Sequence, residues 1–442
     1  MNKTSLAMGV LAVSLGGALS GAAHAEFLKD SKATLALRNF YIDNNVRNEA
    51  KPSAREWGQG FMLNYQSGFT EGPVGFGIDA LGLVGVRLDS GGNATKAGRS
   101  RTPGSVFPLS GGEAEDQFGS LGLTGKVKIS KTEARLGTLQ PRLPVVLPNV
   151  GRLLPQTFEG GQITSNEFDN LTLIGGQLEH TKTRASTDQR SLAIGGANLA
   201  KGADSNKFYY AGADYKVTKD LTLQYYYGNL QDFYQQHFLG LVHNWTLPAG
   251  TLKTDLRYFA STSDGKNASA AGRAEGYTSN SYYGANGKVT TGEVDNRTWS
   301  AKFTYGLAGH ALSAGYQQLS GNSAFPYLNQ GDGSTSYLIT DVQINKFLNA
   351  GERSWLAGYA YDFAAVGVPG LKASVLYVNG DHIAAVGRDK QEWERDIRLD
   401  YVLQSGPLKG LGFSWLNGTW RGNAQSDQDD NRLIVSYSIP LL

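Results

Sequence analysis

The sequence predicts an all-β protein, a closed antiparallel transmembrane β-barrel of about 18 strands with inward-folded extracellular loops. Three observations predict this fold. Segments of about ten residues alternate between apolar and polar side chains, short turns alternate with long polar links, and tyrosine and tryptophan gather near the segment ends. Hydrophobic residues make up 40% of the chain and aromatic residues 11%, as expected where half of each strand faces water.

The N-terminus has the pattern of a secretion signal. Lys3 is followed by an apolar stretch from Leu6 to about Leu19 and then by Ala23-His24-Ala25, an Ala-x-Ala cleavage pattern. The apolar stretch is too short and too rich in Gly, Ala and Ser for a good membrane-spanning helix, which is the alternative reading. We therefore expect residues 1–25 to be a signal peptide and residues 26–442 to form one barrel domain.

Period-two alternation recurs after the signal and defines the strands. It is clear in segments 32–41, 121–129, 252–258, 355–363, 371–377 and 433–441. No apolar run there approaches the ~18 residues of a membrane-spanning helix. In lipid an unpaired strand edge leaves backbone groups without partners, so the last strand, 432–442, should pair with the first, 33–41.

The connections are predicted to alternate strictly in length, which favours a membrane barrel over a secreted sandwich. Short turns are expected at 70–73, 130–132, 168–170, 218–220, 248–250, 307–309, 367–370 and 405–407. Long links are expected at 44–52, 89–116, 140–156, 184–206, 263–293, 321–352, 380–391 and 422–431.

Composition and motifs argue against several classes of function. A net charge of +2 does not suit a nucleic-acid binder, and the absence of cysteine excludes disulfides and thiolate metal sites. No Gly-x-Ser-x-Gly, His-Glu-x-x-His or phosphate-binding loop is present, and the glycine-rich run from Gly75 to Ala80 lies inside an alternating strand. The histidines are scattered without ligand spacing. We expect no enzyme activity, no cofactor and no metal.

Two of the long links are unusual because they are apolar. Segment 140–158 holds four prolines between leucines and valines, including Pro144 and Pro148, with Arg142 and Arg152 as its charges. Such a stiff segment cannot extend a sheet and is too apolar to lie in water, so it should fold inward and narrow the barrel. A surface cap is the alternative. By the same reasoning Phe325 and Tyr327, in the segment that ends near Asp332, need a surface to pack against.

These two loops carry a resemblance to a known family. Their motifs are Pro-Asn149-x-x-Arg152-Leu-Leu-Pro-Gln-Thr-Phe158 and Ser-Ala-Phe325-Pro-Tyr327-Leu-Asn-Gln-Gly-Asp332-Gly, and Trp393-Glu-x-Arg395 and Gln404-Ser-Gly-Pro-Leu-Lys accompany them. The sequence resembles the OprD-type specific porins of outer membranes over essentially the whole mature chain. The resemblance implies a monomeric eighteen-stranded barrel in the bacterial outer membrane, whose third and seventh extracellular loops form the constriction and which takes up carboxylate-bearing solutes.

Family members carry a ladder of basic side chains along the pore, and strand parity shows which residues could fill that role. Ten basic residues take the polar parity of their segments: Arg38, Lys126, Lys128, Arg135, Lys253, Arg257, Lys302, Lys372, Arg398 and Arg432. At mid-depth a charge facing hydrocarbon would cost about 2 to 4 kcal/mol, so these should face the lumen. Solvated polar walls with interspersed acids are the plainer alternative. The expected pore-lining set is Arg38, Lys126, Lys128, Arg135, Arg152, Lys372, Arg395, Arg398 and Arg421.

Two positions do not fit the simple ladder. Arg395 has the opposite parity to Arg398, so either a bulge intervenes or Arg395 sits at headgroup level. Ser414 and Leu416 stand where further family arginines are expected.

The resemblance as a whole predicts passive, selective diffusion of small carboxylates, either aromatic or cyclic acids or amino acids. An outer-membrane enzyme and a receptor-type barrel are the alternatives. For an enzyme, the sequence offers no local motif that pairs a nucleophile with a base. A receptor-type barrel would need an N-terminal plug before its first strand.

Overall fold

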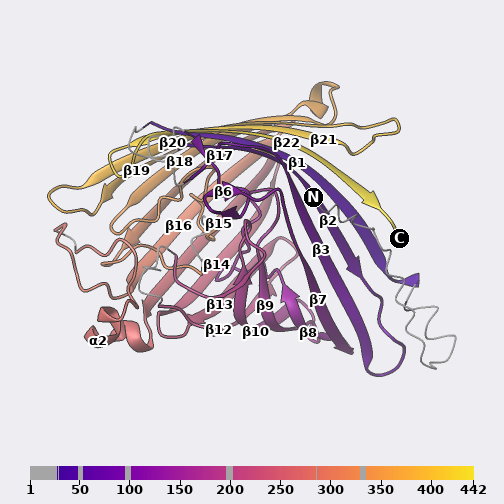
Figure 1. The fold of residues 1–442 in the computed structure, drawn as a ribbon, viewed down its shortest axis with the longest axis horizontal. Coiled ribbons are helices and arrows are strands. Elements are labelled where there is room, and N and C mark those ends of the chain that lie inside the picture. The colour runs from indigo at the N-terminus through magenta and orange to yellow at the C-terminus, as the bar shows by residue number, and fades with distance from the viewer. Residues whose placement is uncertain are drawn as a thin grey trace, which may run out of the picture.

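A computed structural model describes residues 27, 29–47, 53–94, 101–195, 203–284, 286–328 and 335–442. Within them the chain forms one closed antiparallel barrel of 18 long strands, which confirms the predicted fold class (Figure 1). The first nine are β1 (Lys32–Val46), β2 (Ser53–Gln66), β3 (Gly75–Ser90), β7 (Gln117–Ile129), β8 (Thr132–Leu139), β9 (Thr157–Ser165), β10 (Leu171–Lys182), β12 (Phe208–Lys216) and β13 (Leu221–Leu230). The other nine are β14 (Tyr234–Leu247), β15 (Gly250–Ser263), β16 (Asp295–Leu307), β17 (His310–Ser320), β18 (Arg353–Asp362), β19 (Leu371–Ile383), β20 (Lys390–Val402), β21 (Gly412–Gly422) and β22 (Gln428–Pro440).

Each strand pairs with its neighbours in sequence, and the sheet closes between β22 and β1. The closing register runs from Thr34 opposite Pro440 to Val46 opposite Gln428, as the prediction required. Figure 1 shows the C-terminal strands lying beside the N-terminal ones. With both edges paired, the wall leaves no open strand edge toward lipid.

Short strands and short helices lie in the connections between the long strands. The described ones are β4 (Arg101–Thr102), β5 (Leu109–Ser110), β6 (Glu113–Ala114), β11 (Gln189–Ser191), η2 (Gly265–Ala268), α2 (Ala270–Ala274) and η3 (Phe363–Val366). No helix in the described ranges is both long enough and apolar enough to span a membrane.

The connections follow the predicted pattern of short turns at one end and long loops at the other, except at one place. The β13–β14 connection is only Gln231-Asp232-Phe233, although it lies at the long-loop end. Its backbone closes through Phe233 N–H to Leu230 O at 3.0 Å, and Asp232 adopts a φ of 70°. The prediction of strict alternation is therefore wrong here, because Gln231-Asp232-Phe233 contains neither glycine nor proline to mark the turn.

Strand parity separates a lipid face from a lumen face. Leu121 and Leu136 are 72% and 73% exposed and point outward from β7 and β8. The inward positions of the same strands hold Thr124, Lys126 and Arg135, as the alternation predicted. The buried apolar side chains lie inside the barrel, between its wall and the loops that enter it, in clusters that include Phe208.

Candidate functional site: the loop-filled lumen

Loop L3, residues 140–156 between β8 and β9, lies inside the barrel and reaches from one wall to another. Its first half makes a tight turn in which Leu143 and Val146 exchange backbone hydrogen bonds of 2.9 and 3.0 Å. There Val145 approaches the inner wall at Gly228 of β13, and further along Leu153 packs where Gly58 and Gly60 leave space on β2. β2 and β13 are seven strands apart in the ring of eighteen, so L3 crosses the lumen as predicted.

The prolines that suggested this inward path are packed in the interior. Pro144 and Pro148 are both buried, whereas Arg142 is exposed. Asn149 and Gln156 close the second half of the loop, since Gln156 N–H donates to Asn149 O at 2.8 Å and Asn149 N–H donates to Gln156 Oε1 at 2.9 Å. These bonds satisfy backbone groups that the prolines leave outside any sheet.

Loop L7, residues 321–352 between β17 and β18, enters the lumen from the same end as L3 but from a distant part of the wall. Phe325 packs edge-on against Phe259 of β15 with ring centroids 4.9 Å apart, and the Pro326 carbonyl accepts from Gln236 Nε2 at 3.1 Å. Tyr327 O accepts from Gly195 N–H at 2.8 Å. The aromatic residues of this loop therefore have the packing surface that the sequence demanded.

Buried carboxylates of the wall hold the inward loops. Glu56 on β2 accepts four backbone N–H groups of loop L2, residues 91–116, at 2.7 to 3.4 Å. Glu394 on β20 accepts from Ile344 N–H at 2.7 Å and Asn345 N–H at 2.8 Å in L7. Asp396 accepts from Gln343 N–H at 3.0 Å. These acids are directed at backbone dipoles, as in anion nests.

Arg38 is a predicted pore residue that contacts the constricting loop L3. It lies on the lumen face of β1 and donates from Nη1 to the L3 carbonyl of Val150 at 3.1 Å. Among the described residues no carboxylate forms an ion pair with it. Arg398 and Arg432 lie within electrostatic range of Arg38, and each of them has an acid partner on its own strand.

Arg398 and Arg432 occupy one row of the lumen wall with Leu416 between them. Asp400 binds Arg398 through both oxygens, at 2.6 and 2.8 Å, and also accepts from Ser414 Oγ at 2.5 Å. Arg432 donates to Asp430 at 2.7 Å and to the Gln343 carbonyl at 2.7 Å. Of the two family departures, Leu416 thus stands between two arginines that are each paired with an acid, and Ser414 binds the acid partner of one of them.

The lower basic residues lie on the lumen face, but most are paired. Lys126 is buried against Asp79 at 2.7 Å and the Ser67 carbonyl at 2.8 Å, and Arg135 lies 4.0 Å from Asp79 and also binds Glu133. At the short-turn end Lys372 pairs with Asp362 at 3.0 Å, and Lys128 lies over the ring of Phe69.

A cavity of about 240 Å³ lies under the start of L3 against the inner faces of β2, β3, β7, β8 and β9. Its lining includes Asp79, Arg135 and Gln162. A second cavity, toward the short turns, shares Arg135 and Gln162 and adds Lys128. Together the two cavities follow one side of the lumen from the constricting loop toward the short-turn end.

Arg395 and Arg421 were predicted to line the pore, and the structure corrects both. The β19–β20–β21 register runs unbroken from Arg395 to Arg398, so there is no bulge. Glu394 faces the L7 backbone inside; its neighbour Arg395 therefore points outward, where Nη2 donates to Asn417 and Thr419. Arg421 shares that outward parity.

Arg152 lies in L3, as predicted, where Nε donates to Ser105 Oγ at 3.1 Å in L2. L2 and L3 therefore meet at this guanidinium, and Lys346 of L7 lies within electrostatic range of it. Asp332, at the end of the predicted second inward segment, lies outside the described residues, as does the predicted signal at 1–25. Within the described part of the chain no cluster of His, Cys, Asp or Glu has the arrangement of a metal site.

A closed barrel with long loops folded into a polar lumen defines the class of outer-membrane porins. The model of the family "outer membrane porin, OprD family" matches residues 25–441. The chain belongs to the OprD family of outer-membrane porins and is a protein of the bacterial outer membrane.

Named relatives agree with this assignment. The porin-like protein GalP of Pseudomonas putida is 35% identical over 94% of this chain and 93% of its own length. The crystal structure of Pseudomonas aeruginosa OccK8 (OprE) is 61% identical, with a TM-score of 0.87 over 94% of this chain and 100% of that one. The crystal structure of Pseudomonas aeruginosa OpdK with vanillate is 34% identical, with a TM-score of 0.82 and the same coverage.

The packing of L3 on β2 predicts the effect of a single added side chain. A Cβ at Gly58 would stand 2.6 Å from Phe107 Cζ and 2.8 Å from Leu153 Cδ2, and overpacking of this kind costs about 1–3 kcal/mol. Gly58→Val should therefore loosen the second half of L3 and raise single-channel conductance. Gly125→Val, at an outward glycine with more space, is the control. Equal conductance in both variants would contradict the packing role.

The burial of Glu352 predicts that the stability of L7 inside the lumen depends on pH. It is fully buried, and burial followed by the charge of Glu392 raises its pKa well above the ordinary value of 4.5. Asn349 Nδ2 bridges the two carboxyl groups at 2.9 and 3.4 Å. A raised folded pKa stabilises the attached loop below the unfolded pKa, and this stabilisation is lost as pH rises through the folded value.

Conductance measured from pH 4.5 to pH 8 should therefore rise and become noisier as L7 loosens. Glu352→Gln, which cannot ionise and keeps a hydrogen-bond donor for Glu392, should flatten that profile. Glu71→Gln, at an exposed position of the short turn between β2 and β3, should leave it unchanged. A profile that stays the same in Glu352→Gln would show that this carboxyl group does not control the loop.

Proposed function

We propose that this porin mediates passive, substrate-selective diffusion of small carboxylate-bearing solutes, aromatic or cyclic acids or amino acids, through a pore narrowed by L3 and L7. The observation that carries the proposal is Arg38, a lumen guanidinium beside L3 with no ion-pair partner among the described residues. Where few waters remain, such a charge lowers the electrostatic barrier for an anion.

The partners of the acidic side chains on the lumen wall support a preference for anions. Glu56, Glu394 and Asp396 accept backbone N–H groups of the inward loops, so their charges are stabilised by loop dipoles. Asp400 and Asp430 neutralise Arg398 and Arg432. These acids are thereby engaged by the loops or by arginines, whereas Arg38 lies beside L3 without an ion-pair partner among the described residues.

The relatives support the substrate class. Vanillate, present in the crystal structure of OpdK, is an aromatic carboxylate. The similarity at 34% identity covers the barrel and both loops, so a carboxylate is a reasonable first solute for this chain.

We also propose that the chain works as a monomer without catalysis. Residues 1–25 are proposed to be a cleaved secretion signal, which N-terminal sequencing of the mature protein would test.

Liposome uptake tests the role of Arg38. At an effective dielectric near 20, a charge about 4 Å away is worth about 4 kcal/mol, against about 1 kcal/mol in water. Arg38→Gln should therefore slow benzoate uptake by about five-fold or more, while Arg398→Gln, whose arginine already pairs with Asp400, should have a smaller effect.

A neutral sugar of similar size provides the control in the same liposomes. Its uptake should stay level or rise in Arg38→Gln, because only a charge has been removed. Equal losses for benzoate and sugar would indicate a displaced L3, and unchanged benzoate uptake would reject the proposed role. A wider panel with arginine would separate acids from amino acids.

A further inference from the structure

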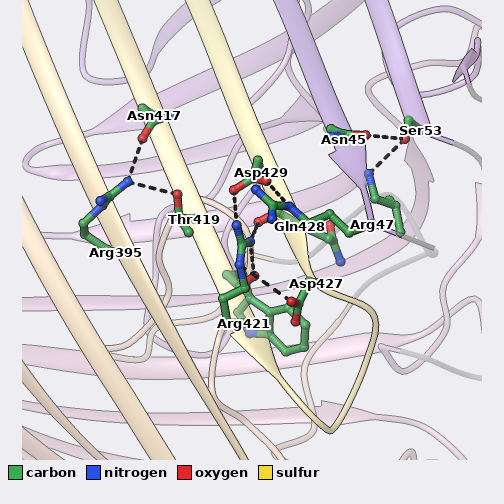
Figure 2. Close-up of polar contacts among 12 residues, drawn as sticks. Asn45, Arg47, Ser53, Arg395, Asn417, Thr419, Arg421, Asp427, Gln428 and Asp429 are labelled. Atoms are coloured by element: carbon green, nitrogen blue, oxygen red, sulfur yellow. Dashed lines mark hydrogen bonds and ion pairs between the residues drawn. The ribbon is translucent and has the colours of Figure 1, made fainter.

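A group of arginines lies on the outward face of the barrel near the long-loop end, away from the pore. It contains Arg395 of β20, Arg421 of β21 and Arg47 just after β1, and we name it the outer arginine patch. Figure 2 shows the three guanidinium groups with their polar partners on neighbouring strands. Outward parity excludes a direct role in contacting solutes inside the lumen.

The patch lies at the depth of an aromatic belt. Outward rings on β16 to β20 follow one another, with centroids 5.4 Å apart for Trp355 and Tyr377 and 5.7 Å apart for Tyr377 and Trp393. Arg395 stands directly opposite Tyr377, and Arg421 stands directly opposite Trp393. Aromatic belts mark the membrane interface, so these two arginines lie at the level of lipid headgroups.

The carboxylates of the patch are already used by two of its arginines. Asp429 binds Arg47 at 2.6 Å and Arg421 at 2.7 Å, and Asp427 lies 3.6 Å from Arg421. Arg395 has only neutral acceptors, Asn417 Oδ1 at 3.2 Å and Thr419 Oγ1 at 3.0 Å, both on the same Nη2.

The charge of Arg395 therefore lacks a counter-ion among the residues that the structure describes. No carboxylate of the described residues pairs with it, and its buried Nε has no acceptor there. Its position at headgroup depth keeps the desolvation cost low, about 0–1 kcal/mol, compared with about 2–4 kcal/mol at the midplane. An anion at the same depth would complete the site.

We propose that the outer arginine patch binds a phosphate group of a phosphorylated lipid in the outer leaflet. A planar guanidinium recognises phosphate through paired N–H donors. Arg421 stands opposite Trp393, two residues from Arg395 on the neighbouring strand, so both arginines can contact the same phosphate. The outward face and the adjoining Trp393 place the acyl chains of such a lipid along the barrel wall. The site depends on the membrane location of the barrel and not on the proposed solute.

Native mass spectrometry of the full-length porin in detergent tests the proposal with bisphosphorylated lipid A as the probe. Wild type should retain one lipid, and Arg395→Gln should lower the apparent affinity by about ten-fold, the loss expected for one charge-assisted interaction. Arg395→Lys, which keeps the charge but not the planar fork, should fall between them. Dephosphorylated lipid A should bind wild type no better than it binds Arg395→Gln.

Arg297→Gln is the matched control, because Arg297 is another outward arginine at the long-loop end but pairs with Asp295 at 3.2 Å. It should bind the lipid like wild type. Heat-modified gel migration should show that every variant is folded. Equal affinity of wild type and Arg395→Gln would overturn the proposal, as would competition by millimolar inorganic phosphate alone or a patch-dependent dimer that forms without lipid.

Discussion

Closure of the sheet between β1 and β22 is the constraint on which the rest of the structure depends. The bilayer offers no hydrogen bonds to backbone groups, so each strand must be paired on both sides. The closing pair, from Thr34 opposite Pro440 to Val46 opposite Gln428, completes this requirement. Once the ring is closed, parity decides for every wall residue whether it meets lipid or lumen, and a change of one residue in register would exchange the two faces.

A closed ring of this size leaves an interior that its own side chains do not fill, and loops occupy the space. Their backbone N–H groups then lie away from bulk water and need acceptors. Glu56, Glu394 and Asp396 provide them from the wall. The same bonds hold the loops and offset the negative charge of the wall, so the architecture of the constriction and the electrostatics of the pore have one cause.

Much of this organisation could be predicted from the sequence, because parity and loop composition are local signals. Arg38 and Lys126 were placed on the lumen face, and L3 inside it, by these signals alone. The three-residue turn at Asp232 was missed because it has no distinctive composition. Arg421 was placed in the lumen although it shares the parity of Phe413 and Trp415, which argued for the outward face. The loop-anchoring acids, such as Glu56, could be given an inward parity but not a partner, since their partners are backbone groups some 50 residues away.

The arginines of β20 to β22 show how one residue type is sorted by position. Arg398 and Arg432 point inward, and each is matched by an acid two residues away on the same strand and face. Arg395 lies three positions from Arg398 and therefore points outward, where the equivalent position holds Ile397 rather than an acid. A guanidinium in bulk water is compensated by solvent and mobile ions, whereas at headgroup depth the anionic lipid groups are the fixed charges nearest to it outside the protein. Because the described residues supply only amide and hydroxyl oxygens to Arg395, a lipid headgroup is the neighbouring group that can add a fixed counter-charge.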